Sequence, residues 1–321
     1  MIRRPSRRAR AAQWVLLLGV VSAAVVLANL AGGNLARRHL DFGFGFLADH
    51  ANFDIPFRLI PWEVGDTYGR ALLVCTLNTL LVSVMGIVTA TLLGLLVGVM
   101  RLSENWLVRN IALWFIEAVR NTPQLVQIIF WYVAVLQTLP APRQSIHLPF
   151  GMLLNIRGLY VPALVDGTVQ FPALHGFNIA GGTQIVPELV AVWAGLSIYA
   201  SAFIAEIVRA AILSVHRGQR EAALSLGLKP GQVMRKVVLP QALRVMVPPL
   251  TSQYLNLIKS SSLGAAVAYP ELFQIFAGTV LNQSGRELET IMLLMAVFLS
   301  INLAASAFMN WYNHRVALVQ R

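Results

Sequence analysis

One lysine lies inside an apolar segment together with amide and hydroxyl side chains. Lys259 follows Asn256 by three positions and directly precedes Ser260, within a mostly apolar run over residues 245–268. Burying an ammonium group costs several kcal/mol unless a partner or water meets it, so its presence there indicates a functional role. Lys259 can bind a carboxylate, and the neighbouring polar groups can bind other atoms of the same ligand. Alternatively, Lys259 pairs with a glutamate or a backbone carbonyl and only holds a broken helix.

Two acid–base pairs lie near the ends of other apolar runs. Glu117 precedes Arg120 by three positions, and Glu206 precedes Arg209 by the same spacing. Residues three apart share a helix face, so each pair suits an ion pair with a structural role. Gln127 lies within a further apolar run and is another uncharged residue that can bind polar atoms.

Several kinds of chemistry lack the residues they require. The single cysteine, Cys75, argues against a cysteine-based metal site, and the six histidines form no pair at helical spacing. A phosphate loop needs Gly-Lys-Ser or Gly-Lys-Thr, but no lysine here follows a glycine. We therefore predict no catalytic residue, no metal site and no cofactor in this chain.

The composition is that of a membrane protein. The 321 residues are 57% apolar and 12% charged, with a mean hydropathy of +0.66. This charged fraction is about half that of a typical soluble domain, so the excess apolar residues must face something other than water. The net charge of +11 comes from basic residues clustered between apolar runs, which favours contact with the lipid bilayer and not with nucleic acid.

A membrane-spanning helix needs about 20 mostly apolar residues, and six segments are candidates. The second has no charged residue from Ala71 to Met100. The fifth is interrupted by Lys259 and three serines and opens with Pro248 and Pro249. The pattern predicts an all-α membrane protein whose spans lie near residues 14–30, 71–100, 122–139, 186–207, 245–268 and 290–309.

The first candidate span has a second interpretation as a secretory signal. Its arginines precede an apolar stretch, and Ala28 to Ala31 resembles a weak cleavage site. The stretch from Trp14 to Leu30 is longer than the usual apolar core of a signal, so we expect an uncleaved extra helix.

Positive charge assigns an orientation to six spans. With a cytoplasmic N-terminus, seventeen Lys and Arg residues lie on the inner side and seven on the outer side, with Lys259 inside a span. Because cytoplasmic loops carry the excess of Lys and Arg, both termini are predicted to be cytoplasmic. The predicted organisation is a basic tail (1–13), an extra span (14–30), an external loop (31–70), a transmembrane domain (71–310) and a cytoplasmic tail (311–321).

The predicted cytoplasmic loop between the fourth and fifth spans, residues 208–244, is patterned. Gln219 to Leu226 are good helix formers, and Gly227 suits a left-handed helix stop. Lys229 to Gly231 read as a turn, after which a second short helix is expected to start near Gln232 and to end before Pro240.

This loop resembles the signature of the membrane subunits of ATP-binding cassette (ABC) importers. That signature is Glu-Ala-Ala, three residues, Gly, nine residues, Ile or similar, one residue and Leu-Pro. Only Val for Ile differs among the matching residues, which are Glu221, Ala222, Ala223, Gly227, Val237, Leu239 and Pro240. The alternative is an ordinary helical hairpin with good helix composition.

The ABC resemblance implies a type I importer fold like that of MetI, with an ATPase-docking loop over residues 219–240. It further implies that separate ATPase subunits use ATP and Mg, and that helices rock around a central site. Lys259, Asn256, Ser260 and Gln127 are then candidates for the translocation path. The pairs Glu117–Arg120 and Glu206–Arg209 are candidates for bracing a gate.

Other segments resemble the polar amino-acid permease family. They are RLSENWLVRNIALWFIEAVRNTPQLVQIIFWY (101–132) and AFIAEIVRAAILSVHRGQREAALSLGL (202–228). DFGFGFL (41–47), LPAPRQS (139–145) and RGLYVPA (157–163) further resemble external loops of general L-amino-acid permeases. The resemblance implies broad-range import of L-amino acids across the bacterial inner membrane by a multi-pass chain. The implied partners are a second homologous permease and a periplasmic amino-acid-binding protein.

Three alternatives remain at this point. One is a narrower ABC importer for a single amino acid or an opine. An ion-driven carrier would typically show internal repeats and several intramembrane acids. An intramembrane enzyme would need a nucleophile and base or metal ligands at helical spacing.

Overall fold

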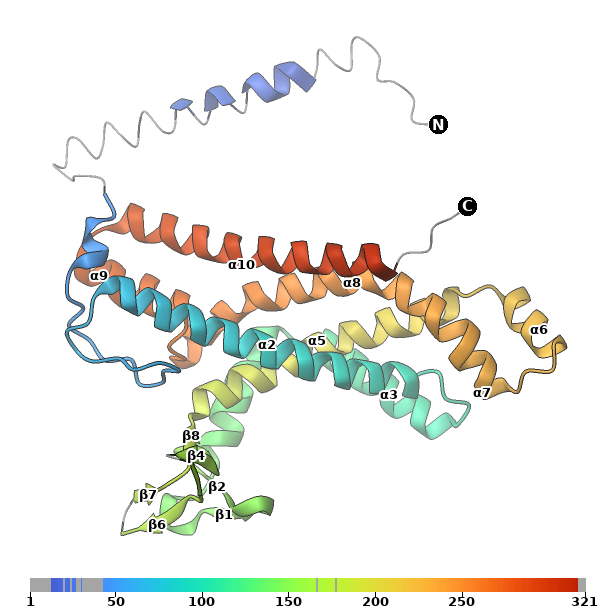
Figure 1. Cartoon of the computed structure of the whole chain (residues 1–321), viewed down its shortest axis with the longest axis horizontal. Coiled ribbons are helices and arrows are strands. Elements are labelled where there is room, and N and C mark those ends of the chain that lie inside the picture. Colours follow the sequence, from blue (N-terminus) through green and yellow to red (C-terminus); the bar gives the residue numbers. More distant parts are fainter. Residues whose placement is uncertain are drawn as a thin grey trace. The chain divides into compact units, whose positions relative to one another are not determined.

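The computed structural model forms two compact units, residues 1–47 and 48–321 (Figure 1). Residues 1–12, parts of the predicted first span, residues 31–42 of the predicted external loop (31–70) and residues 317–321 of the predicted C-terminal tail lie outside the described residues. Helical residues at 14–19 and 21–23 belong to that span. The structure describes residues 13–19, 21–23, 25–26, 30, 43–165, 167–176 and 178–316.

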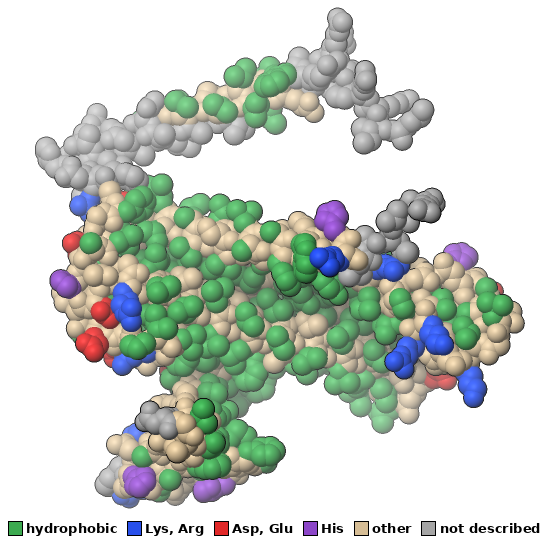
Figure 2. Space-filling view, in the orientation of Figure 1, with side chains coloured by type: hydrophobic (Ala, Val, Ile, Leu, Met, Phe, Trp, Pro, Cys, Tyr) green, Lys and Arg blue, Asp and Glu red, His purple; other side chains and the backbone are tan. Residues whose placement is uncertain are grey.

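Among the described residues, three helices are long and apolar enough to cross a membrane. They are α2 (Tyr68–Met100), α5 (Pro187–Ser214) and α10 (Glu287–Val316). In Figure 2, the face of the second unit shows a mostly apolar band between its ends, with charged side chains gathered at both ends. This distribution is what a bilayer requires, because its interior cannot solvate charge.

Two of the other predicted spans, those at 122–139 and 245–268, are not long regular α-helices. The segment expected at 122–139 is a shorter apolar helix, Gln124–Thr138, and follows α3 (Trp106–Arg120). It consists of α4 (Gln124–Ile129), a π-helical segment η2 (Phe130–Val135) and a 3-10 turn η3 (Leu136–Thr138). The fifth expected span is α8 (Leu239–Ser260), which changes to a 3-10 helix, η7 (Ser261–Val267), at the serine run.

Close packing of α2 against α5 forms the centre of the second unit. A Cβ atom on Gly94 would lie 2.5 Å from Cγ2 of Ile204, and one on Gly98 would lie 2.8 Å from the carbonyl oxygen of Ala205. Small residues four apart let two helix backbones approach where apolar lipid gives no hydrophobic drive for association. These two glycines therefore set the distance between α2 and α5.

The prediction of an all-α fold is wrong for the segment between η3 and α5. Described residues of this segment form a four-stranded sheet of order β1-β2-β3-β8 and two hairpins, β4-β5 and β6-β7 (Figure 1). Short apolar stretches here alternate with glycines at positive φ, such as Gly158 at 123° and Gly182 at 68°, which favours turns and hairpins over helix. The strands are β1 (Ile146–Leu148), β2 (Met152–Asn155), β3 (Gly158–Val161), β4 (Ala163–Val165), β5 (Thr168–Gln170), β6 (Ala173–His175), β7 (Asn178–Ala180) and β8 (Thr183–Ile185).

A buried polar network joins α2 to the segment that follows η7. The Asn78 Nδ2 donates to the carbonyl oxygens of Phe57 and Pro270, both at 2.8 Å. Buried Glu271 accepts hydrogen bonds from the backbone N–H of Phe273 at 2.8 Å and of Gln274 at 2.7 Å. It therefore caps the helical run that begins at Leu272 and continues through η8 (Gln274–Val280) and α9 (Leu281–Ser284).

Candidate ATPase-docking and translocation sites

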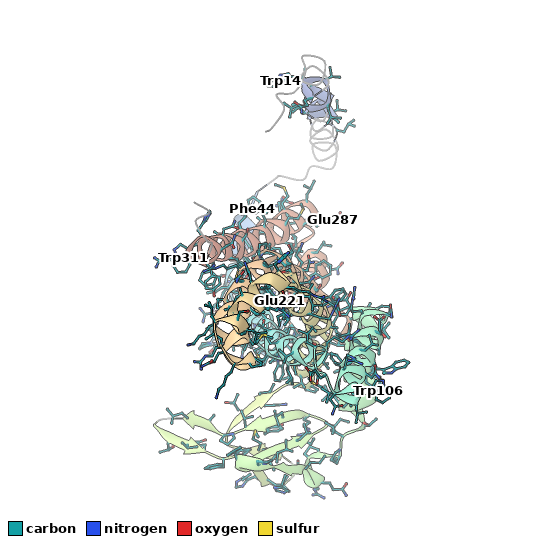
Figure 3. All side chains as sticks on the ribbon, turned by 90° about the vertical axis from the view of Figure 1, so that its right-hand side faces the viewer. Trp14, Phe44, Trp106, Glu221, Glu287 and Trp311 are labelled. Atoms are coloured by element: carbon teal, nitrogen blue, oxygen red, sulfur yellow. The ribbon has the colours of Figure 1, made fainter. Side chains whose placement is uncertain are left out.

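The loop with the Glu-Ala-Ala pattern forms a projecting helical hairpin at one end of the second unit. Its first helix is α6 (Arg217–Ser225) and its second begins as α7 (Pro230–Val233). Figure 3 looks onto this end, and Glu221 is labelled near the centre of the view. Because the hairpin projects from the unit, its residues can contact another protein.

Burial divides the Glu-Ala-Ala triplet into an anchor and an exposed surface. Ala223 is buried, whereas Glu221 and Ala222 are exposed. Leu224 is 47% exposed and Leu226 is 84% exposed. An exposed carboxylate beside exposed apolar side chains forms a surface that another protein can cover.

Gly227 makes the turn between the two helices possible. Its φ is +81°, a left-handed conformation that residues with a Cβ adopt at a cost. The turn is held by hydrogen bonds from Gly227 N–H to the Leu224 carbonyl (2.9 Å) and from Leu228 N–H to the Ala223 carbonyl (3.2 Å). The predicted left-handed stop at Gly227 is confirmed.

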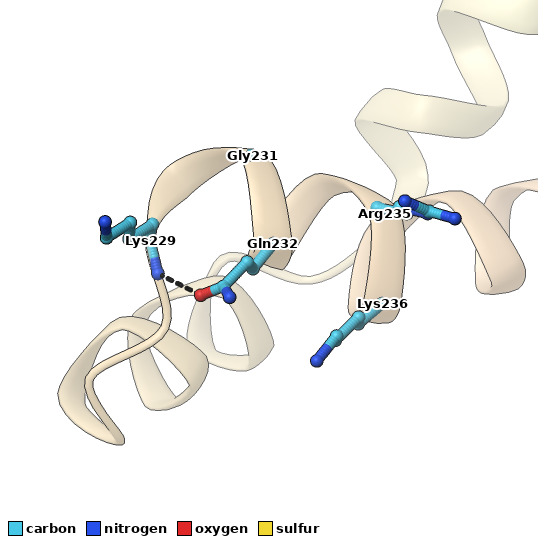
Figure 4. A pocket seen from close by; sticks show the side chains of 5 residues that line it. All are labelled: Lys229, Gly231, Gln232, Arg235 and Lys236. Carbon is cyan, nitrogen blue, oxygen red and sulfur yellow. Dashed lines mark hydrogen bonds between the residues drawn. The ribbon is translucent and has the colours of Figure 1, made fainter.

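The second helix begins with a capped turn and a basic groove. The Gln232 Oε1 accepts a hydrogen bond from the Lys229 backbone N–H at 2.9 Å (Figure 4). A groove of about 540 Å³ beside this turn is lined by Lys229, Gly231, Gln232, Arg235 and Lys236. The hairpin therefore presents Glu221 beside exposed apolar side chains at α6, and a basic groove that runs from Lys229 along the start of the second helix.

The prediction that the second helix ends before Pro240 is wrong. Residues 230–260 are helical throughout, from α7 through a π-helical segment, η6 (Met234–Val238), into α8. Leu239 N–H donates to the Met234 carbonyl, five residues earlier. Proline lacks an N–H and clashes within a regular turn, and the wider π turn accommodates Pro240 without breaking the helix.

Three of the predicted path residues line one cavity. The cavity has a volume of about 300 Å³ and lies where α4, α5 and α8 meet. Within the described part of the chain, its lining holds one cation, several neutral hydrogen-bonding groups and two aromatic rings, and no carboxylate. Its residues are Gln124, Tyr199, Phe203, Gln253, Asn256, Lys259 and Ser260.

The other predicted path residue, Gln127, lies elsewhere. Its Nε2 donates to the carbonyl oxygens of Val119 at 2.9 Å and Thr122 at 3.2 Å. These bonds brace the turn between α3 and α4, where Pro123 precedes the first residue of α4. Gln124, one turn earlier on the same helix, lines the cavity instead.

Sequence reasoning missed Gln124, Gln253 and the two aromatic residues of the cavity. Gln253, Asn256 and Ser260 follow the i, i+3, i+7 spacing of one helix face, which is a usable signal. Tyr199 and Phe203, with ring centres 5.0 Å apart, have the same spacing as ordinary packing residues. Whether these two rings line a cavity depends on which other helices pack against the same face of α5.

The two acid–base pairs differ in structure. Glu206 and Arg209 form a bidentate ion pair on α5, with hydrogen bonds of 2.8 and 3.0 Å to one carboxylate oxygen. Glu117 instead accepts a hydrogen bond from Asn121 at 3.2 Å, and Arg120 lies over the Phe203 ring at 5.1 Å. Arg120 thus contacts a residue of the cavity wall.

No cluster of three His, Cys, Asp or Glu side chains suited to a metal ion occurs within the described residues. The cavity offers hydrogen bonds, one positive charge and aromatic contacts. Its lining includes a cation that can bind a carboxylate and neutral groups that suit other polar atoms.

Comparisons with known proteins agree over most of the chain. Residues 90–318 match the family described as binding-protein-dependent transport system inner membrane component. The permease protein YhdX of Escherichia coli K12 is 43% identical, over 99% of this chain and 96% of its own length. The general L-amino acid transport system permease protein AapQ of Rhizobium johnstonii is 42% identical, over 90% of this chain and 87% of its own length.

The fold also matches a solved structure. The crystal structure of an amino acid ABC transporter with histidines aligns with a TM-score of 0.58 at 24% identity, covering 77% of this chain and 95% of that one. This likeness supports the type I importer fold expected from the Glu-Ala-Ala pattern. The chain belongs to the family of inner membrane permease components of binding-protein-dependent ABC transport systems.

Proposed function

We propose that this chain is the permease subunit of an importer for L-amino acids of several side-chain classes. Its relatives AapQ and BztB support the substrate class, since their names specify general L-amino acids and the glutamate/glutamine/aspartate/asparagine group. The cavity supports breadth, because Lys259 can bind the carboxylate common to all amino acids while Gln124, Gln253 and Asn256 are neutral. A narrower importer for one amino acid or an opine is the alternative.

The observation that carries the mechanism is the continuous helical run from Pro230 to Ser260. Its first turns belong to the docking hairpin, and its last turns supply Asn256, Lys259 and Ser260 to the cavity. We propose that an ATPase using ATP and Mg docks on Glu221, Ala222 and the exposed Leu224 and Leu226. Movement of this hairpin then moves α8 and changes access to the cavity.

The remaining partners and the topology follow from this proposal. A second, homologous permease completes the pathway, and a periplasmic binding protein delivers the amino acid. Both termini lie in the cytoplasm, as the distribution of Lys and Arg favours. The docking hairpin is then on the side of the ATPase.

ATP-dependent uptake tests the substrate proposal. The chain is reconstituted in proteoliposomes with its co-encoded permease, ATPase and binding protein, and labelled acidic, basic and neutral L-amino acids are supplied. Uptake of members of all three classes supports the broad range. Uptake of one member alone favours the narrower importer, and no uptake by an assembled, ATP-hydrolysing complex contradicts the amino-acid assignment.

A further inference from the structure

A second large groove lies between α8 and α10, on a different face of α8 from the cavity. The two helices pack side by side near the described end of α10 (Figure 1). The groove has a volume of about 600 Å³, within the range of about 300–1,000 Å³ typical of small-molecule sites. Its lining includes Tyr254 of α8 and Tyr312 of α10, whereas Asn256 and Lys259 line the other cavity.

One end of this groove carries unneutralised positive charge. Arg244 of α8 and Arg315 of α10 both line it. The sequence of α8 contains no acidic residue, and α10 contains none after Glu289. Neither arginine forms an ion pair with a described carboxylate, although Arg315 lies 5.0 Å from the centre of the Trp311 ring.

The rest of the groove is apolar and extends away from the arginines. Val247 and Leu250 follow Arg244 along α8, and Phe308 and Met309 precede Arg315 on α10. The helices α8 and α10 run in opposite directions (Figure 1). The residues that follow Arg244 on α8 and those that precede Arg315 on α10 therefore lie on the same side of the two arginines. A ligand that fits must therefore be anionic at one end and apolar along its length.

We propose that this groove binds an anionic phospholipid of the cytoplasmic leaflet. Its phosphate lies between Arg244 and Arg315, and an acyl chain lies along Val247, Leu250 and Phe308. The positive charge that assigns this end to the cytoplasm also places it beside the leaflet that carries anionic lipids. Guanidinium groups bind phosphate through paired N–H donors, so the headgroup contributes the missing negative charge.

Native mass spectrometry of the full chain in detergent tests this site. Phosphatidylglycerol and phosphatidylcholine with identical acyl chains are titrated separately, and lipid-bound protein is quantified. The wild type is expected to prefer phosphatidylglycerol by about thirtyfold, the effect of two arginines near an anionic surface. The double variant R244Q/R315Q is expected to lose this preference, and R244K/R315K is expected to retain most of it.

Two further variants separate charge from shape. Arg109→Gln removes one arginine from α3, outside the groove, and should leave the lipid preference unchanged. Leu250→Trp fills the apolar part and should weaken binding of both lipids while the arginines remain. Thermal unfolding of each variant establishes that it is folded.

Several outcomes would overturn the proposal. One is equal binding of the two lipids by the wild type, and another is an unchanged preference in R244Q/R315Q. Displacement of phosphatidylglycerol by millimolar inorganic phosphate alone would show a free-anion site. If the wild-type chain binds lipid by itself but loses that lipid when the second permease is added, the groove belongs to the interface between permeases.

Discussion

The guanidinium of Arg120 lies over the ring of Phe203, with its central carbon 5.1 Å from the ring centre. Arg120 ends α3, whereas Phe203 is on α5 and lines the cavity that contains Lys259. A cation over an aromatic ring is worth about 0.5–1 kcal/mol at exposed sites. This contact couples the end of α3 to one wall of the cavity.

Replacing Arg120 with Gln should reduce uptake two- to fivefold, as roughly 0.5–1 kcal/mol of lost cation–π energy implies. The reason is that Phe203 loses the cation that orients its ring. Initial uptake rates in proteoliposomes measure the effect, and Arg120→Lys should retain part of the activity. Arg109→Gln, on the same helix, serves as the control, and an equal loss there would show a general effect of removing charge from α3.

Replacing Lys259 with Met should abolish uptake while the complex with the ATPase still assembles. Among the described residues that line the cavity, Lys259 is the only cation, so its loss removes the proposed carboxylate contact. Lys259→Arg should restore measurable uptake because it keeps the charge. Unchanged affinity and rate in Lys259→Met would mean that this lysine has only a structural role.

Replacing Gly227 with Val should disrupt the docking hairpin. A residue with a Cβ at a φ of +81° costs about 1–2 kcal/mol, so the turn between α6 and α7 shifts. Co-purification of the ATPase with the tagged chain should fall strongly, although the chain still inserts into the membrane. Gly278→Val, at an open site without a positive φ, is the matched control. Normal ATPase recovery with Gly227→Val would contradict the docking role.

Replacing Gly98 with Leu should destabilise the contact between α2 and α5. A Cβ there would lie 2.8 Å from both the Ala205 carbonyl oxygen and the Val208 Cβ, and backbone atoms cannot move aside easily. Overpacking of this kind costs about 1–3 kcal/mol. Thermal unfolding in detergent should show a lower melting temperature for Gly98→Leu. Val99→Leu, at a neighbouring residue that is 58% exposed, should leave the melting temperature unchanged.

Replacing Glu271 with Ala should destabilise the chain by about 0.5–2 kcal/mol, the usual cost of removing a helix cap. The change removes the buried carboxylate that accepts hydrogen bonds from the N–H groups of Phe273 and Gln274. Glu271→Gln keeps one side-chain oxygen and should cost less. The exposed Glu287→Gln provides the comparison, and equal melting temperatures for all three variants would exclude the capping role.

Local sequence patterns determined a large part of this description. The uncharged stretch from Ala71 to Met100 predicted α2, because hydropathy and length are properties of one segment. The spacing from Glu221 to Gly227 predicted the first helix of the hairpin and its left-handed stop, because capping is also local. The family followed from the same residues.

Tertiary structure decided which polar residues meet. Lys259 and Asn256 share a cavity with Gln124 because α4 and α8 pack against the same part of α5, whereas Gln127 turns back to brace its own loop. The helix also continues past Pro240, since a π turn absorbs the proline that a sequence pattern marks as a stop. Which residues line a cavity depends on packing between distant segments, whereas periodicity and spacing describe one segment at a time.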